Sequence, residues 1–339
     1  MHQRLAALFA LAAFGVLILV NLNSRAPASG NPEARVSFQI ATGASGGSFF
    51  TIGQAIAGLI SHPPGVGRCE ISTVCGPSGV ILSARTSQGS FDSLTAVNNG
   101  LVDSALVQAD MTEAAVKGDG PFRRAGPLRN VRVIAALFPA PVQLLVREGA
   151  RIDRIGDLAG KRVALGAVSS DTYGTARAIL AAFGVRYGSL RRVTSSDPAA
   201  DLAAGKLDAF FVIAPAPSPL VTAALAGGKA RLLAIDGEAT RRLLIGNHQL
   251  VAATIPAGTY PGVPETVTVA DRILWVVRAR APDAQIYGLT RALFNPANHA
   301  ALVASHPAAS AIALATAIQA LPAALHPGAA RYYREVGKL

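Results

Sequence analysis

What the sequence has little of excludes several classes of protein. The 339 residues include only two cysteines, and just 15% are Asp, Glu, Lys or Arg. Lys and Arg exceed Asp and Glu by 31 to 20, but the basic residues are scattered and no run reaches five. The missing basic patch argues against nucleic acid as a partner. The excess is better explained as a solvated surface that also attracts anionic solutes.

Aromatic residues are scarce as well, at 6%, whereas apolar residues make up 51%. Alanine is the main apolar type, which predicts tightly packed helices. A chain of this length can form two domains of ordinary size. The dinucleotide pattern G-x-G-x-x-G, with an acidic residue at the required distance, is not matched, and no cofactor is predicted.

One segment only is long and apolar enough to suggest membrane contact. Leu5 to Val20 carries no charge, follows Arg4, and precedes small residues at 26–28 that resemble a signal-peptide cleavage site. The run is near the short limit for a membrane span. Residues 1–28 are therefore predicted to be a signal peptide or an N-terminal membrane anchor, which contacts the membrane if uncleaved. Either way the body of the protein is expected in the periplasm.

The two cysteines, Cys69 and Cys75, are six residues apart in a Gly-rich stretch. In an oxidising compartment this spacing favours a local disulfide, with two unpaired thiols as the alternative. A loop this short would gain about 2 kcal/mol of stability in the chain-entropy model. A metal needs more ligands than these cysteines and nearby His62 supply, so no metal site is predicted.

Strand and helix signals alternate after a linker at 24–35, which is typical of α/β units with largely parallel sheets. The first strand, at 36–40, leads through a Gly/Ser/Thr loop into an apolar helix. A strand at 163–166, a polar loop at 169–175 and a second apolar helix repeat this arrangement. Two such loops at the ends of strands predict a ligand cleft between two units.

Two further strands are predicted in the middle of the chain, at 131–137 and 142–146. Pro139 and Pro141 lie between them and predict a bend. A strand-rich segment at 266–277 carries the single Trp275.

The loop from Thr42 to Ser48 is the strongest candidate for a site. Free N–H groups and small hydroxyls at a helix N-terminus attract carboxylates and phosphates. The same loop matches G-x-S-x-G around Ser45, the nucleophile elbow of α/β-hydrolases. Nothing but the linker precedes its strand, however, so no earlier strand supplies an oxyanion loop. A serine hydrolase is therefore the weaker alternative, and no catalytic residue is predicted.

Seven short motifs follow one another along roughly residues 36–337. They are ATGASGGSFF at 41–50, GSFDSL at 89–94, GLVDSALVQAD at 100–110, LAGKRV at 158–163, GKLDAFF at 205–211, IPAGTYP at 255–261 and HPGAARYYRE at 326–335. Each motif is weak alone, but the ordered set resembles the TAXI family of substrate-binding proteins of TRAP-type transporters.

The resemblance implies a fold like that of type II periplasmic binding proteins, with two α/β lobes joined by crossing strands. Lobe I would comprise residues 36–140 and 265–339, and lobe II residues 141–264. The lobes would close by a hinge on a small anionic solute, an acidic amino acid or a dicarboxylate, and present it to a TRAP membrane permease. No chemistry is expected on the solute. A membrane-tethered sensory module is the other alternative.

The residues expected to bind the solute come from both lobes. The family commonly has Tyr-Tyr where this chain has Phe49-Phe50, and often Gly where it has Asp171, which would repel a carboxylate or accept an ammonium group. The full predicted set is Thr42, Gly43, Ser45, Gly46, Gly47, Phe49, Ser90, Gln108 and Asp110 in lobe I, and Ser170, Asp171, Thr172, Thr175, Ala214 and Pro215 in lobe II.

Overall fold

The structure is a computed structural model that describes residues 35–70, 74–167 and 170–339. The predicted signal peptide or anchor at 1–28 lies outside the described residues, as does Ser169 of the second polar loop. From Ser37 to Leu339 the chain forms one compact unit. None of the helices in the described ranges has both the length and the apolar character that crossing a membrane requires.

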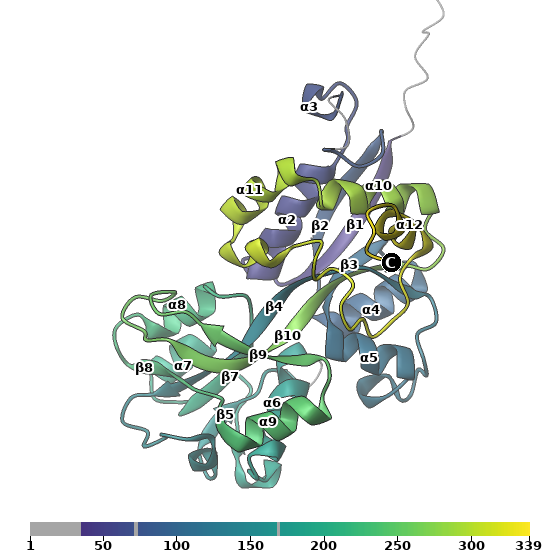
Figure 1. The fold of residues 1–339 in the computed structure, drawn as a ribbon. Coiled ribbons are helices and arrows are strands. Elements are labelled where there is room, and N and C mark those ends of the chain that lie inside the picture. Colours follow the sequence, from purple (N-terminus) through teal and green to yellow (C-terminus); the bar gives the residue numbers. More distant parts are fainter. Residues whose placement is uncertain (1–34, 71–73, 168–169) are drawn as a thin grey trace, which may run out of the picture. The chain divides into compact units, whose positions relative to one another are not determined.

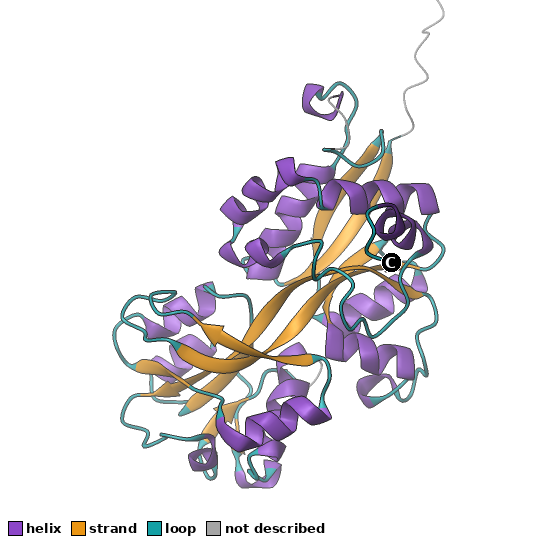
Figure 2. Ribbon diagram, in the orientation of Figure 1, coloured by secondary structure: helices purple, strands orange, loops and turns teal. Residues whose placement is uncertain are grey.

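The described residues form a mixed sheet of ten strands flanked by helices (Figures 1 and 2). The strands are β1 (Val36–Gly43), β2 (Val80–Thr86), β3 (Ser104–Gln108), β4 (Val131–Arg147), β5 (Arg162–Ala164), β6 (Arg191–Arg192), β7 (Ala209–Ile213), β8 (Ala230–Leu233), β9 (Leu250–Ile255) and β10 (Thr266–Arg278). Their order is β2-β1-β3-β10-β4-β7-β5-β6, with β8 paired to β4 and β9 to β10. The long strands β4 and β10 pair antiparallel, and Figure 1 shows them running between the two halves of the sheet.

Helices cover both faces of each half. The β1–β3 half carries α2 (Ser48–Ile60), α3 (Gly67–Glu70), α4 (Ser90–Asn99), α5 (Ala109–Lys117), α10 (Asp283–Leu293), α11 (Pro296–Ser305) and α12 (Pro327–Glu335). The β5–β8 half carries α6 (Asp171–Ala182), α7 (Pro198–Ala203), α8 (Pro219–Leu225) and α9 (Gly237–Gly246).

Strand β10 shows why the centre of the sheet has a nearly unbroken apolar sequence. Ile273, Trp275 and Val277 pack into the core that includes α2 and α10, whereas Leu274 and Val276 pack into the core that includes α4 and α5. Successive side chains of a strand point to opposite faces. A strand covered by helices on both faces therefore needs apolar residues at nearly every position.

The prediction of two strands separated by a bend was wrong, because β4 runs without interruption from Val131 to Arg147. Pro139 and Pro141 stand within it, opposite Arg272 and Ala270 of β10. Both prolines precede Val142, where the pairing of β4 with β7 begins. Their missing N–H groups therefore leave no ladder bond to β7 unmade, and the strand tolerates them.

An ion-pair cluster ties the β5–β8 half to the end of β4. The buried carboxylate of Asp208 accepts hydrogen bonds from Arg147 Nη2 at 2.9 Å and from Arg162 Nε and Nη2 at 3.0 and 2.8 Å. These hydrogen bonds hold the pKa of Asp208 well below its ordinary value, and those from the Arg162 side chain contribute more than the one from Arg147. Bidentate arginine–carboxylate pairs of this kind fix geometry as well as charge.

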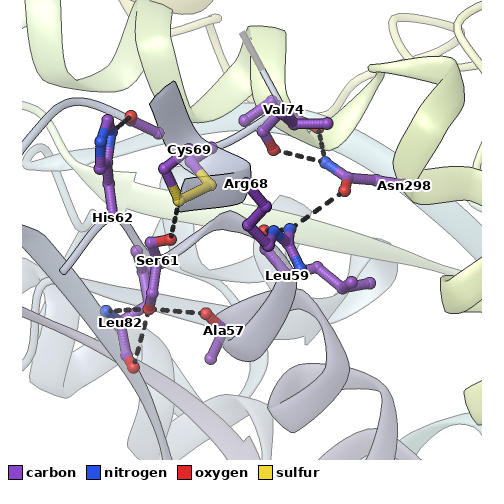
Figure 3. The surroundings of a disulfide bond; sticks show 12 residues. Ala57, Leu59, Ser61, His62, Arg68, Cys69, Val74, Leu82 and Asn298 are labelled. Atoms are coloured by element: carbon purple, nitrogen blue, oxygen red, sulfur yellow. Dashed lines mark hydrogen bonds between the residues drawn. A yellow bond between two sulfur atoms is a disulfide. The ribbon is translucent and has the colours of Figure 1, made fainter. Parts of the chain in front are cut away.

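A disulfide joins Cys69 to Cys75, whose Cα atoms are 5.3 Å apart (Figure 3). The loop that it closes is tied to α11. Arg68 donates to Asn298 Oδ1 at 3.3 Å, and Asn298 Nδ2 donates to the carbonyl of Val74 at 2.7 Å. The side chain of one α11 residue therefore holds the loop on both sides of the disulfide (Figure 3).

Two glycines of α2 have opposite surroundings. A Cβ at Gly53 would lie 2.4 Å from the methyl group of Thr42, at the end of β1, whereas a Cβ at Gly58 would meet nothing within 4 Å. Gly53 therefore allows the first half of α2 to lie directly against β1. This contact sets the position of the α2 N-terminus, where the first predicted loop ends.

Candidate functional site

Hydrogen bonds between helix N-termini bring distant residues together. The backbone N–H of Ser90, the first residue of α4, donates to Asp171 Oδ1 at 2.9 Å, and Asp171 is the first residue of α6. The hydroxyl of Thr175 in α6 donates to Asp110 in α5 at 3.1 Å. Ser90 Oγ accepts from the N–H of Gln108, the last residue of β3, at 2.9 Å. Five of the predicted ligand-binding residues therefore form one cluster, in which two contacts join the two halves of the sheet.

Gln108 is the most informative member of this cluster. The residue is 1% exposed, yet neither its Nε2 nor its Oε1 has a hydrogen-bond partner among the described residues. Buried polar side chains are hydrogen-bonded in most proteins, because leaving them unpaired costs free energy. A fixed, unpaired donor and acceptor at the end of a strand are suited to bind a polar solute.

Asp271, which the sequence analysis did not include, lies next to Gln108 on the sheet. The register of β10 and β3 places Ile273 opposite Gln108, and Asp271 is two residues from Ile273 on the same face. Diagonal neighbours of this kind are about 7–8 Å apart. Asp271 is fully buried, and neither carboxylate oxygen has a hydrogen-bond partner in the part of the chain that the structure describes. The signal was an acidic residue in the middle of a strand that is mostly apolar.

The carboxyl groups of the cluster perturb one another. Burial raises the pKa of Asp171 to about 7, although part of the residue is exposed, and the charges of Asp110 and Asp92 act in the same direction. Hydrogen bonds from Ser90 oppose this shift. Burial also raises the pKa of Asp271 well above its ordinary value, and the charges of Asp110 and Asp171 add to the shift. Desolvation and like charge both favour the protonated form of a carboxyl group.

The hydroxyls of the first loop are not equally available. Thr42 is buried and donates its hydroxyl to the carbonyl of Arg85 at 2.9 Å. Ser45 is exposed, and together with Asp92 it lines a surface cavity of 730 Å³. Ser48, the first residue of α2, is buried, and its Oγ has no hydrogen-bond partner within the described ranges. Ser48 is therefore better placed than Thr42 to donate to a solute at this helix end.

The other predicted residues of this loop set the direction of α2. Gly43 and Gly46 have φ angles of +148° and +82°, which favour glycine. Gly47 is the N-cap residue of α2. Phe49 stacks on Phe138 of β4, with the ring centroids 6.3 Å apart. The phenylalanine therefore contacts a strand that joins the two halves of the sheet.

The remaining predicted residues lie around the N-terminus of α6. Ser170 is its N-cap residue and lines a cavity of 580 Å³. Thr172 Oγ1 accepts from the backbone N–H of Ile213 at 3.3 Å. Ala214 and the buried Pro215 follow directly after β7. These residues connect α6 to the end of β7, and that they contact a solute stays a prediction.

Solved structures of other proteins share the fold of this chain. The structure of MatC from Rhodopseudomonas palustris with bound malate matches with a TM-score of 0.53 at 16% identity, over 89% of this chain and 97% of that one. The periplasmic aliphatic sulphonate binding protein SsuA from Escherichia coli matches with a TM-score of 0.45 at 16% identity, over 88% and 82% of the two chains. The predicted α/β fold class is confirmed.

The family follows from the sequence itself. The pattern that defines the NMT1-like family matches residues 40–337, nearly the whole described part of the chain. The protein therefore belongs to the NMT1-like family.

Proposed function

We propose that this chain is a periplasmic solute-binding protein of a TRAP-type secondary transporter, of the TAXI kind. It would capture a small anionic solute, an acidic amino acid or a dicarboxylate, and present it to a membrane permease. The observation that carries the proposal is the buried, unpaired amide of Gln108 among the N-termini of helices from both halves of the sheet. In open α/β sheets, ligands bind at the carboxyl ends of strands, and Gln108 ends β3.

A carboxylate of the solute would bind at the N-terminus of α2. The first N–H groups of a helix lack partners inside the helix, and the helix dipole favours an anion there. Ser48 adds a buried hydroxyl that has no partner among the described residues. At the N-terminus of α4, by contrast, Asp171 already accepts from the N–H of Ser90. Of these two helix ends, α2 is therefore the better position for an anionic group.

Closure would be a hinge motion of lobe I, residues 36–140 and 265–339, against lobe II, residues 141–264. The strands β4 and β10 pass between these parts and would bend. The hydrogen bonds Ser90–Asp171 and Thr175–Asp110 join the same parts. They would break when the lobes open, which gives the solute access to Gln108.

A pair of buried glutamines tests the site. Gln143 is as buried as Gln108, but its amide bonds to the carbonyl of Ala214 at 3.0 Å and to the hydroxyl of Tyr260 at 2.6 Å. Gln108→Leu should keep the wild-type stability, since it loses no hydrogen bond, and should abolish binding of the solute. Gln143→Leu should lose about 1–3 kcal/mol of stability, because its buried partners are left unpaired.

The measurement is calorimetric titration of both variants and the wild type with L-glutamate, L-aspartate, succinate and 2-oxoglutarate. Native mass spectrometry of the protein as purified identifies any solute that it retains. Wild-type binding that survives Gln108→Leu would place the solute elsewhere. Reconstitution with the permease, and uptake driven by an ion gradient rather than by ATP, tests the TRAP-type assignment.

The serine hydrolase alternative finds little support in the histidines. His306 and His326, two buried histidines from the last part of the chain, bond to backbone groups at Pro217, Ala308 and Gly328. Turnover of ester substrates that is lost in Ser45→Ala would support the hydrolase and overturn the binding protein.

A further inference from the structure

Three carboxyl groups from three elements lie near the end of β3, where Gln108 has its buried amide, and act on one another. Asp110 belongs to α5, Asp171 to α6 and Asp271 to β10. We propose that Asp110, Asp171 and Asp271, with Gln108, form a subsite for a protonated primary amine of the solute. The inference rests on the proposed function and narrows it: an amino acid satisfies this subsite, and a dicarboxylate without an amine does not.

The carboxyl groups lack the partners that buried acids normally have. No hydrogen-bond partner among the described residues meets either oxygen of Asp271 or Oδ1 of Asp110, and the carboxyl group that acts most strongly on Asp271 is that of Asp110. The charged groups that act on them from the surrounding helices are acidic, namely Asp92 on α4 and Asp171 on α6. Arg272 follows Asp271 in β10 and the two charges attract each other, but the guanidinium donates its hydrogen bonds to His248, Gln249, Gln319 and Ala320 and none to Asp271. A buried carboxylate is costly unless it is paired, so these carboxyl groups can all be ionised only when a cation binds among them.

Gln108 is independent evidence that this cluster receives a ligand. Its amide is 1% exposed and unpaired in the described part of the chain, so the free donor and acceptor are not explained by internal packing. The strand register places it on the same face as Asp271. The amide oxygen of Gln108 and the carboxyl oxygens of the cluster are acceptors for the three N–H donors of an ammonium group.

The alternative cation, a metal ion, is less well matched. Within residues 35–70, 74–167 and 170–339, no group of three or more His, Cys, Asp or Glu side chains has an arrangement that would hold a metal ion. Divalent ions need several oxygen ligands at short, fixed distances. An ammonium group tolerates carboxylates at hydrogen-bond distance and needs fewer of them.

Binding of the amine must be accompanied by loss of protons from the cluster. Without solute, burial and mutual repulsion keep the Asp271 carboxyl group protonated. For the same reason, Asp171 is protonated in a fraction of the molecules at neutral pH. When the ammonium group enters, its charge favours the ionised carboxylates, which release their protons to solvent. The amine itself stays protonated throughout. The affinity for an amine should therefore fall as the pH is lowered.

A series of compounds whose two end groups are joined by three methylene groups isolates the amine. Glutarate has a carboxylate at both ends, 4-aminobutyrate has one carboxylate and one amine, and 1,3-diaminopropane has two amines. Calorimetric titration in buffers of different ionisation enthalpy gives both affinity and proton release. Binding of 4-aminobutyrate with proton release, and weaker binding of glutarate, is the expected result. Equal or tighter binding of glutarate, or binding of none of the three, overturns the inference.

Isosteric variants separate a binding role from a structural one. Asp271→Asn and Asp110→Asn should each weaken binding of 4-aminobutyrate about tenfold or more, the scale of a lost charged hydrogen bond. Without solute, Asp271→Asn should melt above the wild type at alkaline pH, because a buried, unpaired acid is removed. Asp236→Asn, at an exposed position before α9, is the control and should change neither property. A lower melting temperature for Asp271→Asn together with unchanged affinity would make Asp271 a structural residue and overturn its place in the subsite.

Different results would overturn the amine subsite and the proposed function. Binding of succinate or 2-oxoglutarate without proton release, or a retained solute that lacks a basic nitrogen, removes the amine subsite but leaves the binding protein. If neither the acidic solutes nor glutarate, 4-aminobutyrate and 1,3-diaminopropane bind, and the protein retains no solute, both the subsite and the proposed function are removed.

Discussion

The burial of the Asp171 carboxyl group should make the stability of this protein depend on pH in an unusual direction. Asp171 lies in one half of the sheet and Ser90 in the other, and the carboxyl accepts from the N–H at 2.9 Å. Replacing Asp171 by Asn keeps an acceptor oxygen in place and removes the titration. The perturbation therefore changes charge with little change in shape.

The magnitude follows from the pKa of this carboxyl. Burial raises it from 3.8 to about 7, and a shift of about three units corresponds to about 4 kcal/mol. Because the folded protein binds this proton more tightly than the unfolded chain, the stability contribution is complete below pH 3.8. It declines as the pH rises and is lost above about pH 7. This direction is opposite to that of a salt-bridged carboxylate such as Asp208, whose pKa is lowered.

The assay is urea unfolding of the wild type, Asp171→Asn and the control Asp236→Asn, without solute, between about pH 4 and pH 8. The variant should gain stability relative to the wild type as the pH rises, by up to about 4 kcal/mol. Titration of Asp271 acts in the same direction but is common to all three proteins. A difference between wild type and Asp171→Asn that stays constant across this range would refute the reasoning.

Three other predictions concern the frame that holds the site. Gly53→Ala should destabilise the protein by about 1–3 kcal/mol, because the new methyl group clashes with β1. Gly58→Ala in the same helix should instead stabilise it by about 0.5–1 kcal/mol. Urea midpoints compare the two variants, and equal effects would contradict the packing of α2 against β1. Asp208→Asn should cost about 1–3 kcal/mol, because the buried carboxylate loses its charge-assisted hydrogen bonds to two half-exposed arginines; an unchanged midpoint would count against this. Replacing Cys69 and Cys75 together by Ala should cost about 2 kcal/mol, and reductant should lower the melting temperature of the wild type but not of this variant.

Local sequence was sufficient to predict the elements that border the site. The change from alternating to helical spacing around Thr42–Ser48 predicted a strand, a loop and a helix, which are β1, the loop and α2. The second helix was predicted too, but its start was wrong: α6 begins at Asp171, so residues 171–175 of the predicted polar loop form its first turn. Close spacing in a Gly-rich stretch pointed to a pairing of Cys69 with Cys75, and the structure contains that disulfide. These are short-range features, so a window of a few residues contains the forces that produce them.

The residues of β4 alone do not predict that it is one continuous strand. Two prolines in seven residues locally favour a bend, yet β10 pairs with β4 through both of them. The ladder to a strand more than a hundred residues later overrides the local preference. Long-range pairing of this kind depends on where the partner lies, which no window of sequence contains.

The sequence by itself determined that this is an α/β protein with two small polar loops at helix N-termini, because spacing, glycine and helix-end chemistry are local properties. Only the tertiary structure decided which polar groups meet there. It placed Asp271 of β10 beside Gln108 of β3, and Asp171 of α6 against Ser90 of α4. The charges and unpaired atoms of the candidate site arise from these long-range contacts, since burial and repulsion exist only once the strands and helices have come together.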